Sequence, residues 1–393
     1  MLASTSQRSL PKTVIVGAGV IGLAIAWRLA QAGCAVTVYD RDEVGHGASW
    51  AAAGMLAAAA ETEPGEEMLL PLTLESQRQW PDFARELEAV SGVSVGYRDE
   101  GTIVVALTRD DAEQLRFTYE FQKGLGLDIE WLSGAAARQR EPHLRPGIPA
   151  GVLSPRDHQV ENRALVRALA AAVRATGVTV REHCAVEALD LAGRRVRGVI
   201  TARGQERADV VVLAAGAWSR EIGGIPVDCL PPVRPIKGQM LALRMDAEAP
   251  LISHVLWLPR GYLVPRLDGR LVIGATVEER GFNSNMTAGG LLALIEGAWR
   301  AVPAIEELPI DETWAGFRPG SRDDAPLVGP SAIDGLVIAT GHHRNGILLT
   351  PVTAQTISSY VLTGRLSESL RPFSPERFTT SALGGTEVAR TAP

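Results

Sequence analysis

The chain has 393 residues, 46% of them hydrophobic and 21% charged, which is the balance of a globular protein with room for two domains. A net charge of −6, with no run of lysine and arginine, argues against a nucleic-acid partner, because phosphate binding requires a basic face. The three cysteines are far apart and support neither a disulfide framework nor a thiolate metal site, so we expect a reduced, cytoplasmic setting.

The N-terminal stretch, MLASTSQRSLPK, lacks the apolar core of a secretory signal. The most apolar segment, residues 14–26, contains three glycines and falls short of the roughly 20 residues that a membrane span requires. We therefore expect no membrane partner, and disordered tails at residues 1–11 and 379–393.

A strand, a glycine-rich turn, a helix and a second strand follow one another near the start of the chain. Residues 13–16 and 36–39 are short β-branched runs typical of buried strands, and an apolar-periodic stretch between them reaches Leu29. This order within about 30 residues predicts a βαβ unit.

The remaining elements follow in chain order. Residues 48–60 are nearly all small and are expected to be a loop running into a helix, with a further helix at 66–90. Strands are predicted at 102–107, from 178, at 194–200, at 209–213 and at 336–339, with helices at 165–176 and from 347. Between residues 233 and 276, strand-like runs alternate with turn residues, including a hairpin at Asp268-Gly269, which predicts an antiparallel block.

Three glycines stand as G-x-G-x-x-G where the first helix begins. Gly17 permits the tight turn, Gly19 lets a pyrophosphate approach the backbone, and Gly22 lets the helix pack closely on the strand. The helix N-terminus adds free N–H groups and a positive dipole end. Asp40, at the end of the next strand, is placed to accept from ribose hydroxyls, which disfavours NADP. This context favours a dinucleotide site over a glycine-rich turn in an unrelated α/β protein.

Two later segments distinguish FAD from NAD, which glycine spacing alone does not. DVVVLAAGAWS at 209–219 and GLVIATGHHRNGIL at 335–348 each read as a buried strand ending in a turn of small residues. Such turns meet a cofactor at the carboxyl edge of a sheet, so a long cofactor touched at many points is indicated. The cysteines lie outside these motifs, so we expect noncovalent FAD. An NAD-dependent dehydrogenase is the alternative.

The pattern predicts an α/β fold with a discontinuous, Rossmann-type FAD-binding domain and an α+β substrate-binding domain with a mainly antiparallel sheet. The FAD-binding domain is expected to comprise residues 12–92, 155–231 and 313–375. Residues 93–154 and 232–312 are expected to form the substrate-binding domain.

A set of motifs carries a family resemblance. GAGVIG with its downstream acid, GASWAAAGML, VVVLAAGAWS, GYLVPR, WAGFRPGS and GHHRNGIL occur in an order that resembles the D-amino-acid oxidase superfamily of flavoproteins. Within it the chain is most similar to the glycine oxidases of thiamine thiazole biosynthesis, over roughly residues 13–364. The resemblance implies noncovalent FAD, a two-domain fold, a homo-oligomer (a tetramer in the family), and oxidation of a small amine that bears a carboxylate.

The resemblance also implies a set of FAD contacts. They are Gly17, Gly19, Val20, Ile21, Gly22, Asp40, Arg41, Ala48, Ser49, Ala53, Gly54, Met55, Val186, His342, His343, Arg344, Asn345, Gly346, Ile347 and Leu348. Trp50 departs from the small polar residue expected beside Ser49. The adjacent histidines have no carboxylate or cysteine at useful spacing, so no metal site is expected.

The implied catalytic residues are Arg318, Arg344 and Tyr262. An arginine fork binds a carboxylate bidentately, and Arg318 follows an apolar stretch, where a merely solvated arginine would be out of place. A surface ion pair remains the alternative for Arg318, a phosphate-binding or capping role for Arg344, and simple packing for Tyr262.

The implied reaction converts glycine, dioxygen and water to glyoxylate, ammonia and hydrogen peroxide. Positioning against the flavin would supply most of the catalysis, since the sequence offers no obvious general base. The alternatives are a D-amino-acid dehydrogenase that reduces a quinone, a sarcosine-type oxidase, or a flavin-binding module of an RNA-modifying protein. The acidic balance argues against the last of these.

Overall fold

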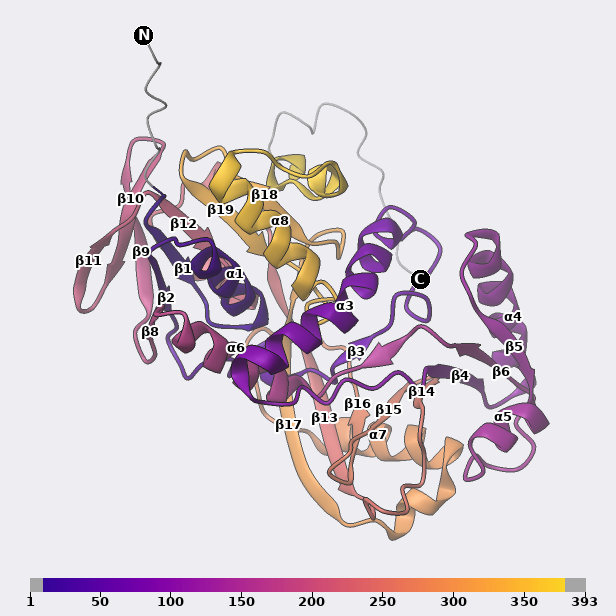
Figure 1. Ribbon diagram of the computed structural model, residues 1–393. Coiled ribbons are helices and arrows are strands. Elements are labelled where there is room, and N and C mark those ends of the chain that lie inside the picture. The colour runs from indigo at the N-terminus through magenta and orange to yellow at the C-terminus, as the bar shows by residue number, and fades with distance from the viewer. Residues whose placement is uncertain (1–9, 379–393) are drawn as a thin grey trace.

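The computed structural model describes residues 10–378, and most of its strands belong to two large sheets (Figure 1). The first sheet has the order β18-β19-β12-β1-β2-β8, and its neighbours run parallel except β18, which is antiparallel to β19. Its strands are β1 (Thr13–Val16), β2 (Val36–Tyr39), β8 (Thr179–Arg181), β12 (Val210–Leu213), β18 (Leu327–Pro330) and β19 (Leu336–Thr340). The start, middle and end of the chain therefore meet in one Rossmann-type sheet.

Both faces of the first sheet are covered, which explains its unbroken apolar strands. Ile15 points into a core shared with the helices α1 (Val20–Gln31), α3 (Leu70–Ser91), α6 (Asn162–Ala175) and α8 (Thr350–Thr363). Val14 and Val16 point the other way, into a core shared with a three-stranded sheet. Its antiparallel strands are β9 (Val186–Ala192), β10 (Arg195–Thr201) and β11 (Gly204–Arg207).

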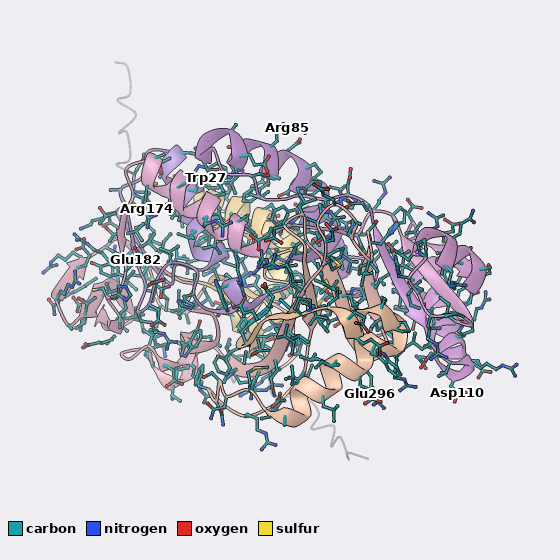
Figure 2. The ribbon with its side chains drawn as sticks, turned by 90° about the horizontal axis from the view of Figure 1, so that it is seen from below. Trp27, Arg85, Asp110, Arg174, Glu182 and Glu296 are labelled. Atoms are coloured by element: carbon teal, nitrogen blue, oxygen red, sulfur yellow. The ribbon has the colours of Figure 1, made fainter. Side chains whose placement is uncertain are left out.

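The second sheet has eight strands in the order β17-β13-β16-β15-β14-β4-β6-β5, antiparallel except for the pair β14 and β4. Its strands are β4 (Thr102–Ala106), β5 (Glu130–Ser133), β6 (Ala150–Ser154), β13 (Arg234–Arg244), β14 (Val255–Leu258), β15 (Gly261–Pro265), β16 (Arg270–Gly274) and β17 (Ile310–Gly320). The helices packed on it are α4 (Arg109–Gly124), α5 (Gly134–Arg140) and α7 (Ala288–Ala301). Figure 2 shows Asp110 on α4 and Glu296 on α7 at the periphery of the molecule.

Short 3₁₀ helices complete the described chain. They are η1 (Gly216–Glu221), η2 (Val227–Cys229), η3 (Pro303–Glu307), η4 (Glu368–Phe373) and η5 (Pro375–Phe378). Within residues 10–378, no helix combines the length and the apolar character that a membrane crossing requires.

The predicted mixed fold is confirmed, and several elements lie where the sequence places them. The strands at residues 13–16 and 36–39 have the predicted bounds, and Gly269, with φ at +85°, turns the antiparallel pair β15 and β16. The tails expected to be disordered fall mostly on residues 1–9 and 379–393, which lie outside the described chain.

Two expectations are corrected. The small-residue tract 48–60 does not run into a helix: it holds only α2 (Ala48–Ala51) and β3 (Met55–Leu56), because Gly54, with φ at +71°, turns the chain so that β3 pairs with β7 (His158–Gln159). Residues 313–320 lie in β17, which pairs with β13 along its length, so they join the second sheet and not the first. The division into two domains otherwise remains a proposal.

Candidate active site

A cavity of about 1150 Å³ is lined by residues of both sheets. Its walls come from the turn after β1, the tract around Gly54, the ends of β12 and β19, and strands β13, β15 and β17. This volume exceeds what a drug-sized ligand needs, so the cavity has room for a dinucleotide and a small substrate together.

The glycine turn is shaped for close approach. Gly17 has φ at +109°, and a Cβ there would lie 2.4 Å from the carbonyl oxygen of Ala214. A Cβ on Gly22 would lie 1.9 Å from the carbonyl oxygen of Gly17, so Gly22 holds α1 against the turn. Gly19 lines the cavity itself, and a Cβ there would approach only Ser49 Oγ, at 3.1 Å. The first and third glycines are thus required for packing, and the second leaves space for a ligand.

The acid that ends β2 also braces this turn. Asp40 accepts hydrogen bonds from the backbone N–H of Ala18 at 2.7 Å and of Asp42 at 3.0 Å, and it lines the cavity. Burial raises the pKa of its carboxyl group. Next to it, the guanidinium of Arg41 lies 3.9 Å from the ring centroid of Trp218, which also lines the cavity. This end of the cavity therefore offers a carboxylate, a cation and an aromatic face.

The predicted FAD contacts line the cavity with three exceptions, Gly22, Asn345 and Leu348. Leu348 instead accepts hydrogen bonds from Ser76 Oγ and Trp80 Nε1 through its carbonyl oxygen, and Asn345 donates its N–H to the carbonyl oxygen of His342. These bonds fix the segment before α8. Ser49 Oγ accepts a hydrogen bond from the N–H of Val20 at 3.0 Å. One of the N–H groups at the start of α1 that have no partner within the helix is therefore already paired.

Trp50, the departure from the family pattern, does not line the cavity. Its ring packs edge-on against Trp314, with centroids 6.0 Å apart, and the guanidinium of Arg163 lies 3.7 Å from its ring centroid. The tryptophan therefore anchors α2 to β17 from behind and leaves the cavity wall unchanged.

A buried arginine holds the tract around Gly54 in place. Arg266, 5% exposed, donates to the carbonyl oxygens of Ala53 at 2.6 Å and Val160 at 2.7 Å, and to Asn162 Oδ1 at 3.1 Å. These partners are neutral, and burial lowers the pKa of Arg266 to about 10. It joins the end of β15 to the wall of the cavity.

Arg266→Met should destabilise the protein by at least about 3 kcal/mol, because several buried acceptors would lose their donor at once. Arg85→Met is the matched control. Arg85 lies exposed on α3 and, among residues 10–378, pairs only with Asp82, so its loss should cost under about 1 kcal/mol (Figure 2). Denaturant unfolding of both variants measures the difference in the free energy of unfolding. Equal losses would show that the buried hydrogen bonds of Arg266 do not stabilise the protein.

Arg318 presents an unpaired guanidinium to the cavity. Its Nη1 donates to the carbonyl oxygen of Thr276 at 3.2 Å, and within residues 10–378 it forms no ion pair with a carboxylate. Gly238 makes room for it, since a Cβ there would lie 2.6 Å from that nitrogen. A half-buried arginine without a counter-charge is well suited to bind a carboxylate.

Tyr262 lies beside this arginine. Burial raises the pKa of the Tyr262 hydroxyl and the charge of Arg318 opposes the shift, which leaves a protonated hydroxyl that can donate. Gly274 gives the ring its place, since a Cβ there would lie 2.5 Å from the phenol oxygen. The structure thus brings two of the three predicted catalytic residues together.

Arg344 lines the same cavity but is already paired. Its Nε donates to Glu61 Oε2 at 2.7 Å, and its Nη2 lies 2.7 Å from each carboxylate oxygen of Glu66. Two carboxylates therefore occupy the fork, which makes Arg318 the stronger candidate for a substrate ligand. Glu61, also in the cavity wall, is a residue that the sequence reasoning did not single out.

The two adjacent histidines are neutral near pH 7. Burial lowers the pKa of His342 to about 3, and its Nε2 lies 3.1 Å from Thr353 Oγ1. Burial likewise lowers the pKa of His343 to about 4, against the opposing charge of Asp324. As far as the described residues go, no three His, Cys, Asp or Glu side chains gather to hold a metal ion. Neutral imidazoles therefore add no positive charge to this edge of the cavity.

The chain resembles known proteins along nearly its whole length. The family model described as "FAD dependent oxidoreductase" (DAO) matches residues 12–360. The bifunctional protein ThiO/ThiG of Synechocystis is 38% identical over 374 residues, which cover 94% of this chain and 54% of that protein. The chain thus spans about half the length of such curated relatives. The glycine oxidase of Geobacillus kaustophilus is 36% identical over 367 residues, 92% of this chain and 96% of that enzyme.

The fold agrees with these matches. The crystal structure of glycine oxidase from Geobacillus kaustophilus superposes with a TM-score of 0.87 at 34% identity, covering 93% of this chain and 98% of that one. The glycine turn, the N-terminus of α1 at the cavity wall and the size of the cavity fit FAD. The chain belongs to the DAO family of FAD-dependent oxidoreductases.

Proposed function

We propose that this protein is a glycine oxidase that converts glycine, dioxygen and water to glyoxylate, ammonia and hydrogen peroxide, and that it serves thiamine thiazole biosynthesis. The observation that carries the proposal is the guanidinium of Arg318, which meets no carboxylate in the described part of the chain and lies beside the hydroxyl of Tyr262 in a cavity that the glycine turn also lines. The similarity to a glycine oxidase over nearly the length of both chains supports it, as does the similarity to ThiO/ThiG proteins.

The proposed FAD site consists of the predicted contacts that line the cavity, with Gly22, Asn345 and Leu348 supporting them from behind. FAD supplies a hydride acceptor that can pass electrons on to dioxygen. The proposal includes a cytoplasmic location, supported by the absence of paired cysteines within residues 10–378, and a homo-oligomeric assembly, which rests on the family resemblance.

The roles of the protein side chains follow from their places. Arg318 binds the substrate carboxylate through its fork, and Tyr262 donates a second hydrogen bond to it. Arg344, tied to Glu61 and Glu66, holds the part of the cavity wall that carries Glu61. Small residues at positions 51–54 leave the α-carbon room to approach the flavin, so that positioning supplies much of the rate.

The substrate range tests the proposal. Glycine has no side chain to accommodate, and sarcosine and D-alanine each add only a methyl group. Graded activity among small amines is therefore expected, with about 1–3 kcal/mol of discrimination per methylene. L-Alanine should be rejected, because anchoring its carboxylate on Arg318 with the α-hydrogen toward the flavin points its side chain into protein. Oxygen-dependent peroxide formation is measured with glycine, sarcosine, D-alanine, D-proline and L-alanine.

The cofactor and the electron acceptor are checked in the same preparation. The purified protein should be yellow and should release all of its FAD on acid denaturation. Equal activity on L-alanine and glycine would contradict the proposed pocket. Reduction of the flavin by glycine without peroxide release would favour the dehydrogenase alternative.

A further inference from the structure

Glu61 presents a carboxylate oxygen to the cavity. Its Oε2 accepts from Arg344 Nε at 2.7 Å, whereas no residue in the described part of the chain donates to Oε1. Oε1 is not fully buried and therefore keeps some exposed surface. Glu61 lines the cavity in which a substrate would lie as well as a small neighbouring pocket.

The carboxylate belongs to the same chamber as the proposed carboxylate ligands. Burial raises the pKa of Tyr262, and the charge of Glu61 adds to this shift while that of Arg318 opposes it, so all three groups lie within electrostatic reach. The guanidinium of Arg318 and the carboxylate of Glu61 line one cavity. Together they are complementary to a zwitterionic amino acid, which carries a carboxylate and an ammonium group.

Burial, together with the charged neighbours of Glu61, sets its proton affinity. Burial raises the pKa of Glu61 to about 7; the ion pair with Arg344 opposes the shift, and the charges of Asp157 and Glu66 add to it. Asp157 is itself held by the backbone N–H groups of Ala59 and Ala60, so the loop that carries Glu61 is fixed. The group can therefore change its protonation state close to neutral pH.

We propose that Glu61 is the catalytic base that takes a proton from the ammonium group of the bound amino acid. The inference rests on the function proposed above. Amino acids are ammonium ions at neutral pH, whereas hydride loss from the α-carbon requires the lone pair of the neutral amine. The ammonium and the ionised carboxyl exchange one proton, giving a neutral amine and a protonated Glu61, which later returns its proton to water. Loss of a hydride from the neutral amine, to the flavin that the site would hold, would give the iminium, and water would convert that to glyoxylate and ammonium.

The pH dependence has a definite sign. Glu61 acts only when it is ionised, so its contribution is present above about pH 7 and is lost as the pH falls through that value. Without this base, the enzyme depends on the free-amine fraction in solution. That fraction rises about tenfold per pH unit until the pKa of the substrate amine is reached.

Glu61→Gln tests the proposal in the FAD-loaded enzyme, with anaerobic flavin reduction by glycine followed between pH 6 and pH 10. We expect about a hundredfold loss of the second-order reduction rate at pH 7, with the loss shrinking at high pH. Glu66→Gln is the matched control, because Glu66 also pairs with Arg344 but does not line the main cavity. It should stay within about threefold of the wild type, and Glu61→Asp should recover part of the rate at neutral pH.

A binding measurement separates this inference from the proposed function. Acetate has the carboxylate but no ammonium, so its affinity, read from the flavin absorption spectrum, should weaken as the pH rises through about 7 in the wild type and stay flat in Glu61→Gln. Equal pH profiles for the wild type and Glu61→Gln, or an equal loss in Glu66→Gln, would overturn the role of Glu61. A wild type that no small amine reduces would overturn the proposed function instead, while the acetate titration would still report on Glu61.

Discussion

Arg318→Ala should weaken apparent substrate binding by at least about 2 kcal/mol, roughly thirtyfold, while the protein keeps its full content of FAD. The guanidinium has no carboxylate partner among the described residues, so the substitution breaks no internal ion pair. What it removes is a charge that is available to a ligand. Because a bidentate, charge-assisted pair would be lost with nothing to replace it, the effect on the substrate should be large and the effect on folding small.

The measurement is a titration of the flavin spectrum with acetate, together with steady-state kinetics on glycine. Arg318→Lys is the control: it keeps the charge but loses the fork, so an intermediate affinity is expected. Arg344→Ala provides a second comparison, because it leaves the buried carboxylate of Glu61 without its partner and should lower stability as well. Unchanged affinity in Arg318→Ala, or loss of FAD from it, would mean that Arg318 does not bind the substrate carboxylate.

The first sheet could be predicted because its signals are local. VIV and VVVL are short β-branched and apolar runs of the kind that a strand covered on both faces gives, and the glycine spacing after β1 fixes the turn. The helices α4 and α7 were not predicted. Only Leu115 and Gln122 are buried on α4, so its apolar periodicity is faint, and α7 opens with Gly289 and Gly290, which favour a loop.

The site was predicted only in part, since long-range pairs decide what a residue type does there. Arg318 and Arg344 read alike in the sequence, but Arg344 meets Glu61, 283 residues away, and Arg318 meets no described carboxylate. Glu61 itself ends a run of alanines and carries no local signal. Its place in the cavity wall depends on that pairing and on Asp157, which holds the preceding loop.

Gly22→Ala should cost the protein more stability than any other substitution considered, at least about 4 kcal/mol. The new Cβ would lie 1.9 Å from the carbonyl oxygen of Gly17 and 3.3 Å from Ile15 Cγ2. The backbone of the turn and the buried strand β1 cannot move far enough to relieve the clash with the carbonyl oxygen. The helix α1 would have to leave β1, although nine of its residues are buried in the core.

Gly19→Ala, in the same turn, should have the opposite effect. Gly19 has φ at −73° and ψ at 176°, which alanine adopts without strain, and its Cβ would approach only Ser49 Oγ. The apo-protein should therefore fold with near-normal stability but bind FAD at least about tenfold more weakly, because the methyl group would take up the space that Gly19 leaves for a pyrophosphate to approach the backbone. Thermal unfolding of the two apo-proteins and FAD titration of each separate the effects. A Gly22→Ala protein as stable as the wild type would contradict the packing role of Gly22. A Gly19→Ala protein with unchanged FAD affinity would contradict the role of Gly19 in cofactor approach.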